Sequence, residues 1–112
     1  MSIDSISPLT LLKTDKPEYK QYNDFVNEYN NRVNSFNKQL NNIKSKKLSP
    51  VLKTAYARQM NIAKNNIIQF RRNSINKNID ELQKESKKYN VFSKTRRNIN
   101  NQIKLFENLK SV

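Results

Sequence analysis

The acidic side chains most closely grouped in the sequence are Asp80, Glu81 and Glu85, and clustered carboxylates are the ligands that hard cations prefer. Lys84 and Lys88 lie at the three- or four-residue spacing of ordinary ion pairs on a helix surface. We therefore interpret this group as solvated helix surface, and we expect the protein to hold no metal ion and no cofactor.

Two arginine pairs, Arg71–Arg72 and Arg96–Arg97, indicate a different chemistry, because guanidinium groups match phosphate oxygens in two-point hydrogen bonds. These pairs belong to a large basic surplus. The chain has 22 Lys+Arg against 9 Asp+Glu, a formal net charge of +13. Between Glu28 and Asp80 lie 51 residues with eleven cations and no acidic side chain. Such a surface favours a negatively charged partner, since contact with phosphates releases condensed counterions.

The sequence contains no zinc finger, no aromatic RNA-binding motif, no GXXG loop and no helix-turn-helix with a glycine turn, so we expect contact with the phosphate backbone rather than with base edges. An acidic protein surface is the alternative partner. A third interpretation is a solvated face that reflects AT-rich codons, although such codons also encode Asp and Glu. The candidate contact residues are Lys44, Lys46, Lys47, Lys53, Arg58, Lys64, Arg71, Arg72, Lys94, Arg96 and Arg97.

Composition excludes most enzyme classes. The 112 residues include no His, Cys, Gly or Trp. Without His or Cys there is no imidazole or thiolate for nucleophilic catalysis or zinc binding, and without Gly there is no phosphate-cradling loop. We therefore expect a non-enzymatic protein with no small-molecule substrate. The longest apolar runs are pairs, so no transmembrane segment is expected, and no secretory signal is visible.

Helical periodicity organises most of the chain. A heptad seam with alternating spacings of three and four predicts a first helix over about 17–46, in which we expect the tyrosines to be core residues rather than a platform for stacking bases. Asp15, Pro17 and Glu18 would start this helix. The seam requires a facing helix from this chain or from a second copy. Its members are Tyr19, Tyr22, Val26, Tyr29, Val33, Phe36, Leu40 and Ile43.

A second helix is expected over about 50–89, capped by Ser49 with Pro50 in its first turn. Its apolar stripe moves by roughly 100° beyond Asn73, which indicates either one long helix that changes neighbours or a break at Asn78. We favour the single long helix. Asn90 is expected to stop it in the left-handed conformation, and Ser93 to cap a third helix over about 94–109. The predicted fold class is all-α: an antiparallel three-helix bundle or helical hairpin.

Residues 1–16 show no helical or alternating period, and we interpret them as an extended arm before a single helical domain of residues 17–112. Exposed aliphatic side chains gain nothing in water, so the arm should dock either in a groove of a neighbouring subunit or along its own bundle. The docking residues would be Ile3, Ile6, Leu9, Leu11 and Leu12.

Together these features predict a small basic structural component of a large nucleic-acid-containing assembly, such as a virion or a ribonucleoprotein particle. Its expected location is intracellular or within a viral particle. The alternative is a regulator or inhibitor that dimerises through the heptad seam as a coiled coil and binds an acidic protein. The sequence does not distinguish DNA from RNA as the partner.

Overall fold

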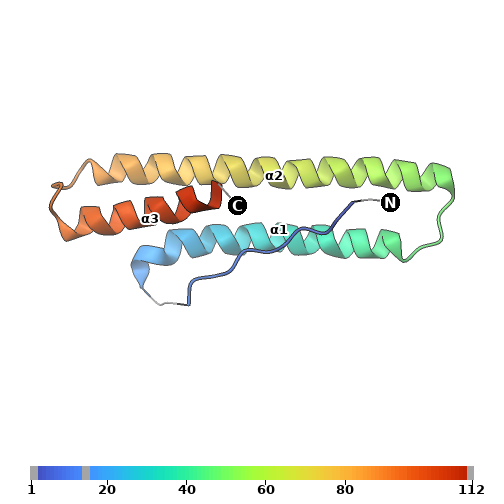
Figure 1. Ribbon diagram of the computed structural model, residues 1–112, viewed down its shortest axis with the longest axis horizontal. Helices are drawn as coiled ribbons and strands as arrows, with labels where there is room; N and C mark the ends of the chain where they lie inside the picture. Colours follow the sequence, from blue (N-terminus) through green and yellow to red (C-terminus); the bar gives the residue numbers. More distant parts are fainter. Residues whose placement is uncertain (1–2, 14–15, 111–112) are drawn as a thin grey trace.

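A computed structural model describes residues 3–13 and 16–110, and within these ranges it shows an extended arm followed by three helices (Figure 1). A 3₁₀ turn, Pro17–Tyr19, leads into α1 (Lys20–Lys44). α2 (Pro50–Ser86) returns antiparallel to α1, and α3 (Lys94–Lys110) folds back along the second half of α2. The predicted all-α fold is confirmed. The molecule is a rod whose Cα atoms span 63 × 24 × 17 Å.

Both predicted serine caps are present. The Ser49 hydroxyl accepts a hydrogen bond from the Leu52 amide at 3.3 Å, and the Ser93 hydroxyl accepts one from the Arg96 amide at 3.1 Å. Each bond satisfies an amide that the first helical turn leaves without an intrahelical partner. The positions at which α2 and α3 begin therefore follow from the sequence. Asp15, the expected cap of the first helix, lies outside the described residues.

The expected role of Asn90 is wrong. α2 ends at Ser86, and no described residue has a positive φ angle. The helix ends through tighter turns, in which the amides of Lys88 and Tyr89 donate to the carbonyls three residues earlier, so a left-handed residue is not needed. Asn90 instead forms an Asx turn, because its side-chain oxygen accepts from the Phe92 amide at 2.9 Å.

α2 is one continuous helix, as favoured from the sequence, and its apolar stripe shifts because its neighbour changes. Its first half packs against α1 through Met60 and Ile67, and its second half turns Ile75, Ile79 and Leu82 inward, where α3 lies. With 37 residues α2 is about 55 Å long, whereas the 17 residues of α3 reach about 25 Å. α3 therefore covers only half of the α1–α2 hairpin.

The heptad seam of α1 is filled from within the chain. Six of its eight members are buried, and Val26, Val33 and Leu40 are fully enclosed. Phe106 of α3 meets the rings of Tyr22 and Phe25 edge-on at centroid distances of 5.6 and 6.0 Å. The seam tyrosines 22 and 29 are core residues, which agrees with the sequence interpretation, and Tyr19 is half-buried.

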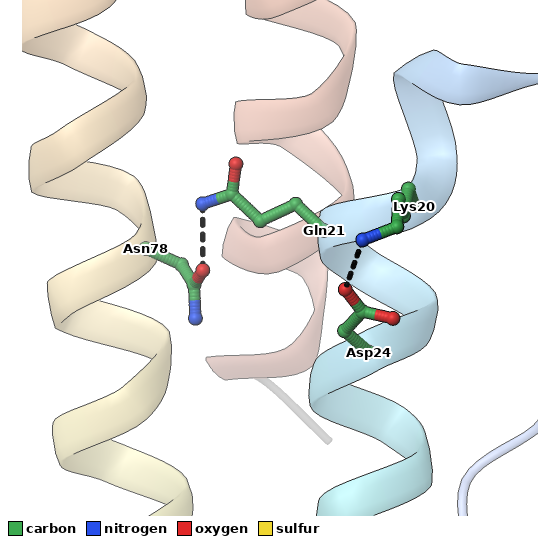
Figure 2. Close-up of polar contacts among 4 residues, drawn as sticks. All are labelled: Lys20, Gln21, Asp24 and Asn78. Carbon is green, nitrogen blue, oxygen red and sulfur yellow. Dashed lines mark hydrogen bonds and ion pairs between the residues drawn. The ribbon is translucent and has the colours of Figure 1, made fainter.

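Polar contacts accompany this core where α1 faces the second half of α2. The Gln21 side-chain amide donates to the Asn78 side-chain oxygen at 2.6 Å, and Lys20 pairs with Asp24 along α1 (Figure 2). Asn78, at which the sequence left a helix break open, also donates to the Ser74 carbonyl one turn earlier. Its side chain thus joins α1 to α2 within an unbroken helix.

Replacing Phe106 by alanine tests the packing of α3. Phe106 is fully buried, so Phe106→Ala should lower the free energy of unfolding by about 3–5 kcal/mol, through lost apolar burial and the cavity left behind. Phe92→Ala is the matched control, because Phe92 is 84% exposed and its loss should change stability by less than about 0.5 kcal/mol. Urea denaturation followed by circular dichroism measures both; equal effects would contradict the placement of α3.

Alkaline pH should weaken the same region through Tyr22. Burial raises the pKa of the Tyr22 hydroxyl above its usual value of 10.0, and the positive charge of Arg71 only partly opposes this effect. Above pH 10 the unfolded chain therefore loses this proton while the folded chain keeps it, so stability falls as pH rises. Tyr22→Phe removes the ionisation, and its stability relative to wild type should increase between pH 9 and about 11. A pH-independent difference between the two proteins would count against this.

Candidate nucleic-acid interface and arm groove

Acidic side chains are absent from a long stretch of the α1–α2 hairpin. Residues 17–28 and 80–110 have nine basic and seven acidic side chains. Residues 29–79, which form the rest of the hairpin, have eleven basic and no acidic side chains. We call residues 29–79 the basic half. Its last residues lie beside α3, where Lys77 shares a hollow with Asp24, Glu28 and Glu81, and Asp4 of the arm lies near Lys64. The excess of positive charge is therefore greatest around the α1–α2 turn.

Ion pairs follow the same division. Among the described residues, Lys20–Asp24, Lys84–Asp80 and Lys88–Glu85 pair at 3.0–3.3 Å outside the basic half, and Arg32 pairs with Glu28 at its boundary at 3.5 Å. These are exposed surface pairs, which agrees with the interpretation of the acidic group at residues 80–85. The described residues include no group of three or more side chains placed to hold a metal ion.

Four predicted contact residues gather at the turn between α1 and α2. Lys44, Lys46 and Lys53 line a hollow of about 170 Å³, and Lys47 is exposed in the same turn. Arg58 and Arg72 are exposed further along α2. None of these six side chains takes part in an ion pair of the described structure, so they leave a surface of uncompensated positive charge.

Lys64 and Arg71, by contrast, are half-buried and bind within the fold. Arg71 donates to the Leu109 carbonyl at 2.9 Å and to the Tyr29 hydroxyl at 3.4 Å, and its guanidinium lies 5.4 Å from the Tyr29 ring centre. A cation is favourable at this place because the last carbonyls of α3 lack intrahelical donors. Arg71 thereby fixes the end of α3. In the sequence it cannot be distinguished from its neighbour Arg72, which is exposed.

The remaining candidates, Lys94, Arg96 and Arg97, lie at the opposite end of the rod, about 55 Å away by the length of α2. The Arg96 guanidinium donates to the Tyr89 carbonyl at 3.2 Å, and that of Arg97 to the Phe92 carbonyl at 3.5 Å. These two arginines brace the loop before α3. The predicted residues therefore do not form one surface: they are divided between the two ends of the rod, with Lys64 and Arg71 bound within the fold between them.

The arm lies along α1 of its own chain, which is the second of the two arrangements expected from the sequence. Asn23, Asn30 and Asn37 of α1 hold it by the backbone. Each asparagine oxygen accepts one arm amide at 2.8–3.0 Å, and each asparagine NH₂ donates to the carbonyl of the same arm residue at 2.8–3.1 Å. We call these three residues the asparagine ladder; their partners are Leu12, Leu9 and Ile6 respectively.

The spacing of the ladder matches the geometry of an extended chain. Seven helical residues rise about 10.5 Å, and three extended residues span about 10 Å. A heptad on α1 is therefore in register with three residues of the arm. The same three-residue period directs aliphatic side chains toward the core: Ile3 is buried, Ile6, Leu9 and Leu12 are partly buried, and Leu11, which is out of phase, is 41% exposed.

The arm supplies the third element of the fold where α3 is absent. Lys64 donates to the Asp4 carbonyl at 3.4 Å, and it lies on the face of α2 that turns Ile75 and Leu82 toward α3 further along. Figure 1 shows the arm crossing α1 toward the gap between α1 and α2, beyond the end of α3. The groove of the basic half is thus closed by the chain's own N-terminal segment.

The ladder was not predicted, although both of its periods can be read in the sequence. The arm has aliphatic residues at every third position, and α1 has asparagine at every seventh. Spacing alone is not sufficient, because Asn27, Asn34 and Asn41 have the same seven-residue repeat and are exposed. Both repeats directly follow seam positions, but at 100° per residue the exposed repeat lies about 40° further from the seam, so only the ladder residues lie beside the groove.

None of the described helices is long and apolar enough to cross a membrane. Comparison with protein-family models, with curated proteins and with solved structures finds no significant match to this chain.

Replacing one ladder residue measures what holds the arm. Asn30→Ala removes two hydrogen bonds to the Leu9 backbone, each of which contributes about 0.5–1.5 kcal/mol, so the free energy of unfolding should fall by about 1–3 kcal/mol relative to the control. The control is Asn34→Ala, which gives the same gain in helix propensity at an exposed position. Urea denaturation provides the comparison, and equal stability of the two variants would contradict the ladder.

Proposed function

We propose that this protein is a non-enzymatic structural component of a nucleic-acid-containing assembly, and that it docks on the phosphate backbone through its basic half. The observation that carries this proposal is the one-sign charge of residues 29–79, which is densest at the exposed α1–α2 turn. Eleven cations occupy residues 29–79 without one acidic side chain, whereas the other half is nearly balanced. Self-repulsion in such a half disfavours folding, and a polyanion relieves it.

The arrangement of the cations favours contact with the backbone over base recognition. Lys44, Lys46 and Lys53 line a small hollow at the α1–α2 turn, and Arg58 and Arg72 add exposed positive charge further along α2. Lysine acts as a point charge with flexible reach, which suits phosphates at variable positions. The aromatic rings of α1 lie in the core and cannot stack on bases.

The coiled-coil alternative receives no support from the fold. Its dimer required an exposed heptad seam, and the seam side chains pack against α2, α3 and the arm of the same chain. An acidic protein remains the competing partner for the basic half, and the experiment below separates it from nucleic acid.

Salt-dependent binding tests the proposal. Fluorescence anisotropy of a labelled duplex and of an unrelated RNA, titrated between about 50 and 300 mM salt, should give a steep decline of log affinity with log salt and little dependence on sequence. Replacing Lys44, Lys46, Lys47 and Lys53 together by glutamine should lower the slope by up to about 3.6 for duplex DNA, at roughly 0.9 for each of four lost phosphate contacts.

A matched control removes the same charge from the other half, by replacing Lys20, Lys84, Lys87 and Lys88 with glutamine. This variant should keep most of the wild-type slope. Equal losses in the two quadruple variants would assign binding to net charge rather than to the basic half. Absence of binding at every salt concentration would refute the nucleic-acid proposal and leave acidic protein as the partner.

A further inference from the structure

The groove that holds the arm has the properties of a binding site for an extended peptide. We propose that it accepts the arm of a second copy of this chain, so that copies are joined by exchange of residues 3–12. The inference deepens the proposed role in an assembly, because it identifies the contact between neighbouring subunits.

The ladder recognises the backbone of its ligand. Six hydrogen bonds join Asn23, Asn30 and Asn37 to the amides and carbonyls of three arm residues, and none of them involves an arm side chain. The same six bonds form whether the arm belongs to this chain or to a neighbour. Selectivity comes from the apolar side chains at every third position, which must face the core between α1 and α2.

The structure also identifies the occupant. A ligand for this groove is an extended segment with aliphatic residues three apart, and Ile3, Ile6, Leu9 and Leu12 of every copy provide such a segment. Exchange therefore requires no new complementarity. Within one chain the arm is present at an effective concentration of about millimolar, so exchange competes where copies are held at comparable local concentration, as in an assembly.

The connection to α1 decides which groove the arm reaches. The arm runs antiparallel to α1, with Leu12 bonded to Asn23. Six residues of helix separate Pro17 from Asn23, a distance of about 9 Å. Deleting residues 13–16 would join Leu12 directly to Pro17, and one peptide unit spans only about 3.8 Å. The shortened chain can keep its own arm only by slipping three residues, which removes one aliphatic side chain from the groove, whereas extension to a neighbour's ladder keeps all four.

The first test is the mass of the chain that lacks residues 13–16, measured by sedimentation equilibrium at about 10–200 μM. We expect the wild-type chain to be monomeric and the shortened chain to have at least twice the monomer mass. Adding Asn23→Ala, Asn30→Ala and Asn37→Ala to the shortened chain should restore the monomer. Adding Asn27→Ala, Asn34→Ala and Asn41→Ala, the exposed repeat on the same helix, should leave the oligomer intact.

A second test uses the full-length chain and does not depend on the deletion. Leu9→Asp weakens docking of the arm on its own groove, because it places a charge where an aliphatic side chain packs against the core. A fluorescent peptide of residues 1–13 should bind this variant in anisotropy titrations at least tenfold more tightly than it binds wild type. The same variant carrying the three ladder substitutions should lose this binding.

An oligomer of the shortened chain that persists without the ladder would overturn the proposal, and a helical monomer, in which the arm has slipped, leaves the decision to the peptide titration. If the shortened chain is unfolded, the peptide titration decides, and failure of the peptide to bind Leu9→Asp refutes the exchange. Neither test contains nucleic acid. The tests can therefore show that arm exchange fails while salt-dependent binding by the basic half is retained. They can equally show that arm exchange occurs while that binding is absent.

Discussion

The fold depends on how an extended segment satisfies its backbone when it is laid against a helical core. Amide and carbonyl groups that lose water must find other partners, and a lone extended strand has none of its own. The asparagine ladder provides them: each side chain is both donor and acceptor, and each serves both polar groups of one arm residue. Without these bonds, burying Ile3 and its aliphatic neighbours would leave the arm's polar groups unsatisfied.

This interaction matters because the helices have unequal lengths. α3 ends beside Tyr29 and Arg71, and beyond this point α1 and α2 face each other without a third helix. Val33 and Leu40 of α1 are nevertheless fully buried there. The arm, together with Met60 and Ile67 of α2, encloses them. A short extended segment thus takes the place of a third helix in this part of the core.

The arm and the proposed nucleic-acid surface belong to the same half of the molecule. The part of the hairpin that the arm completes is also the part with no acidic side chain of its own. Repulsion among its cations opposes folding, and the arm carries no net positive charge between residues 3 and 12 to add to it. Lys64 connects the two features, because its ammonium group binds the Asp4 carbonyl at the groove edge.

Much of this architecture is determined by the sequence alone. Apolar spacings of three and four define α1, serines 49 and 93 define where α2 and α3 begin, and the shifted stripe of α2 predicts a change of neighbour. These features are local: a helical period and a cap depend on residues within a few positions of each other. The one-sign charge of residues 29–79 is likewise a property of the sequence, since it needs no fold to be counted.

Only the tertiary structure decided which similar residues do different work. Arg71 and Arg72 are adjacent and chemically identical, yet α2 turns one toward the end of α3 and the other to solvent. Asn30 and Asn34 lie one turn apart, and only Asn30 meets the arm. These roles depend on where a segment distant in the sequence comes to lie, which no local pattern specifies. The arm's docking was undecided for the same reason, because its ladder lies 11 to 31 residues further along the chain.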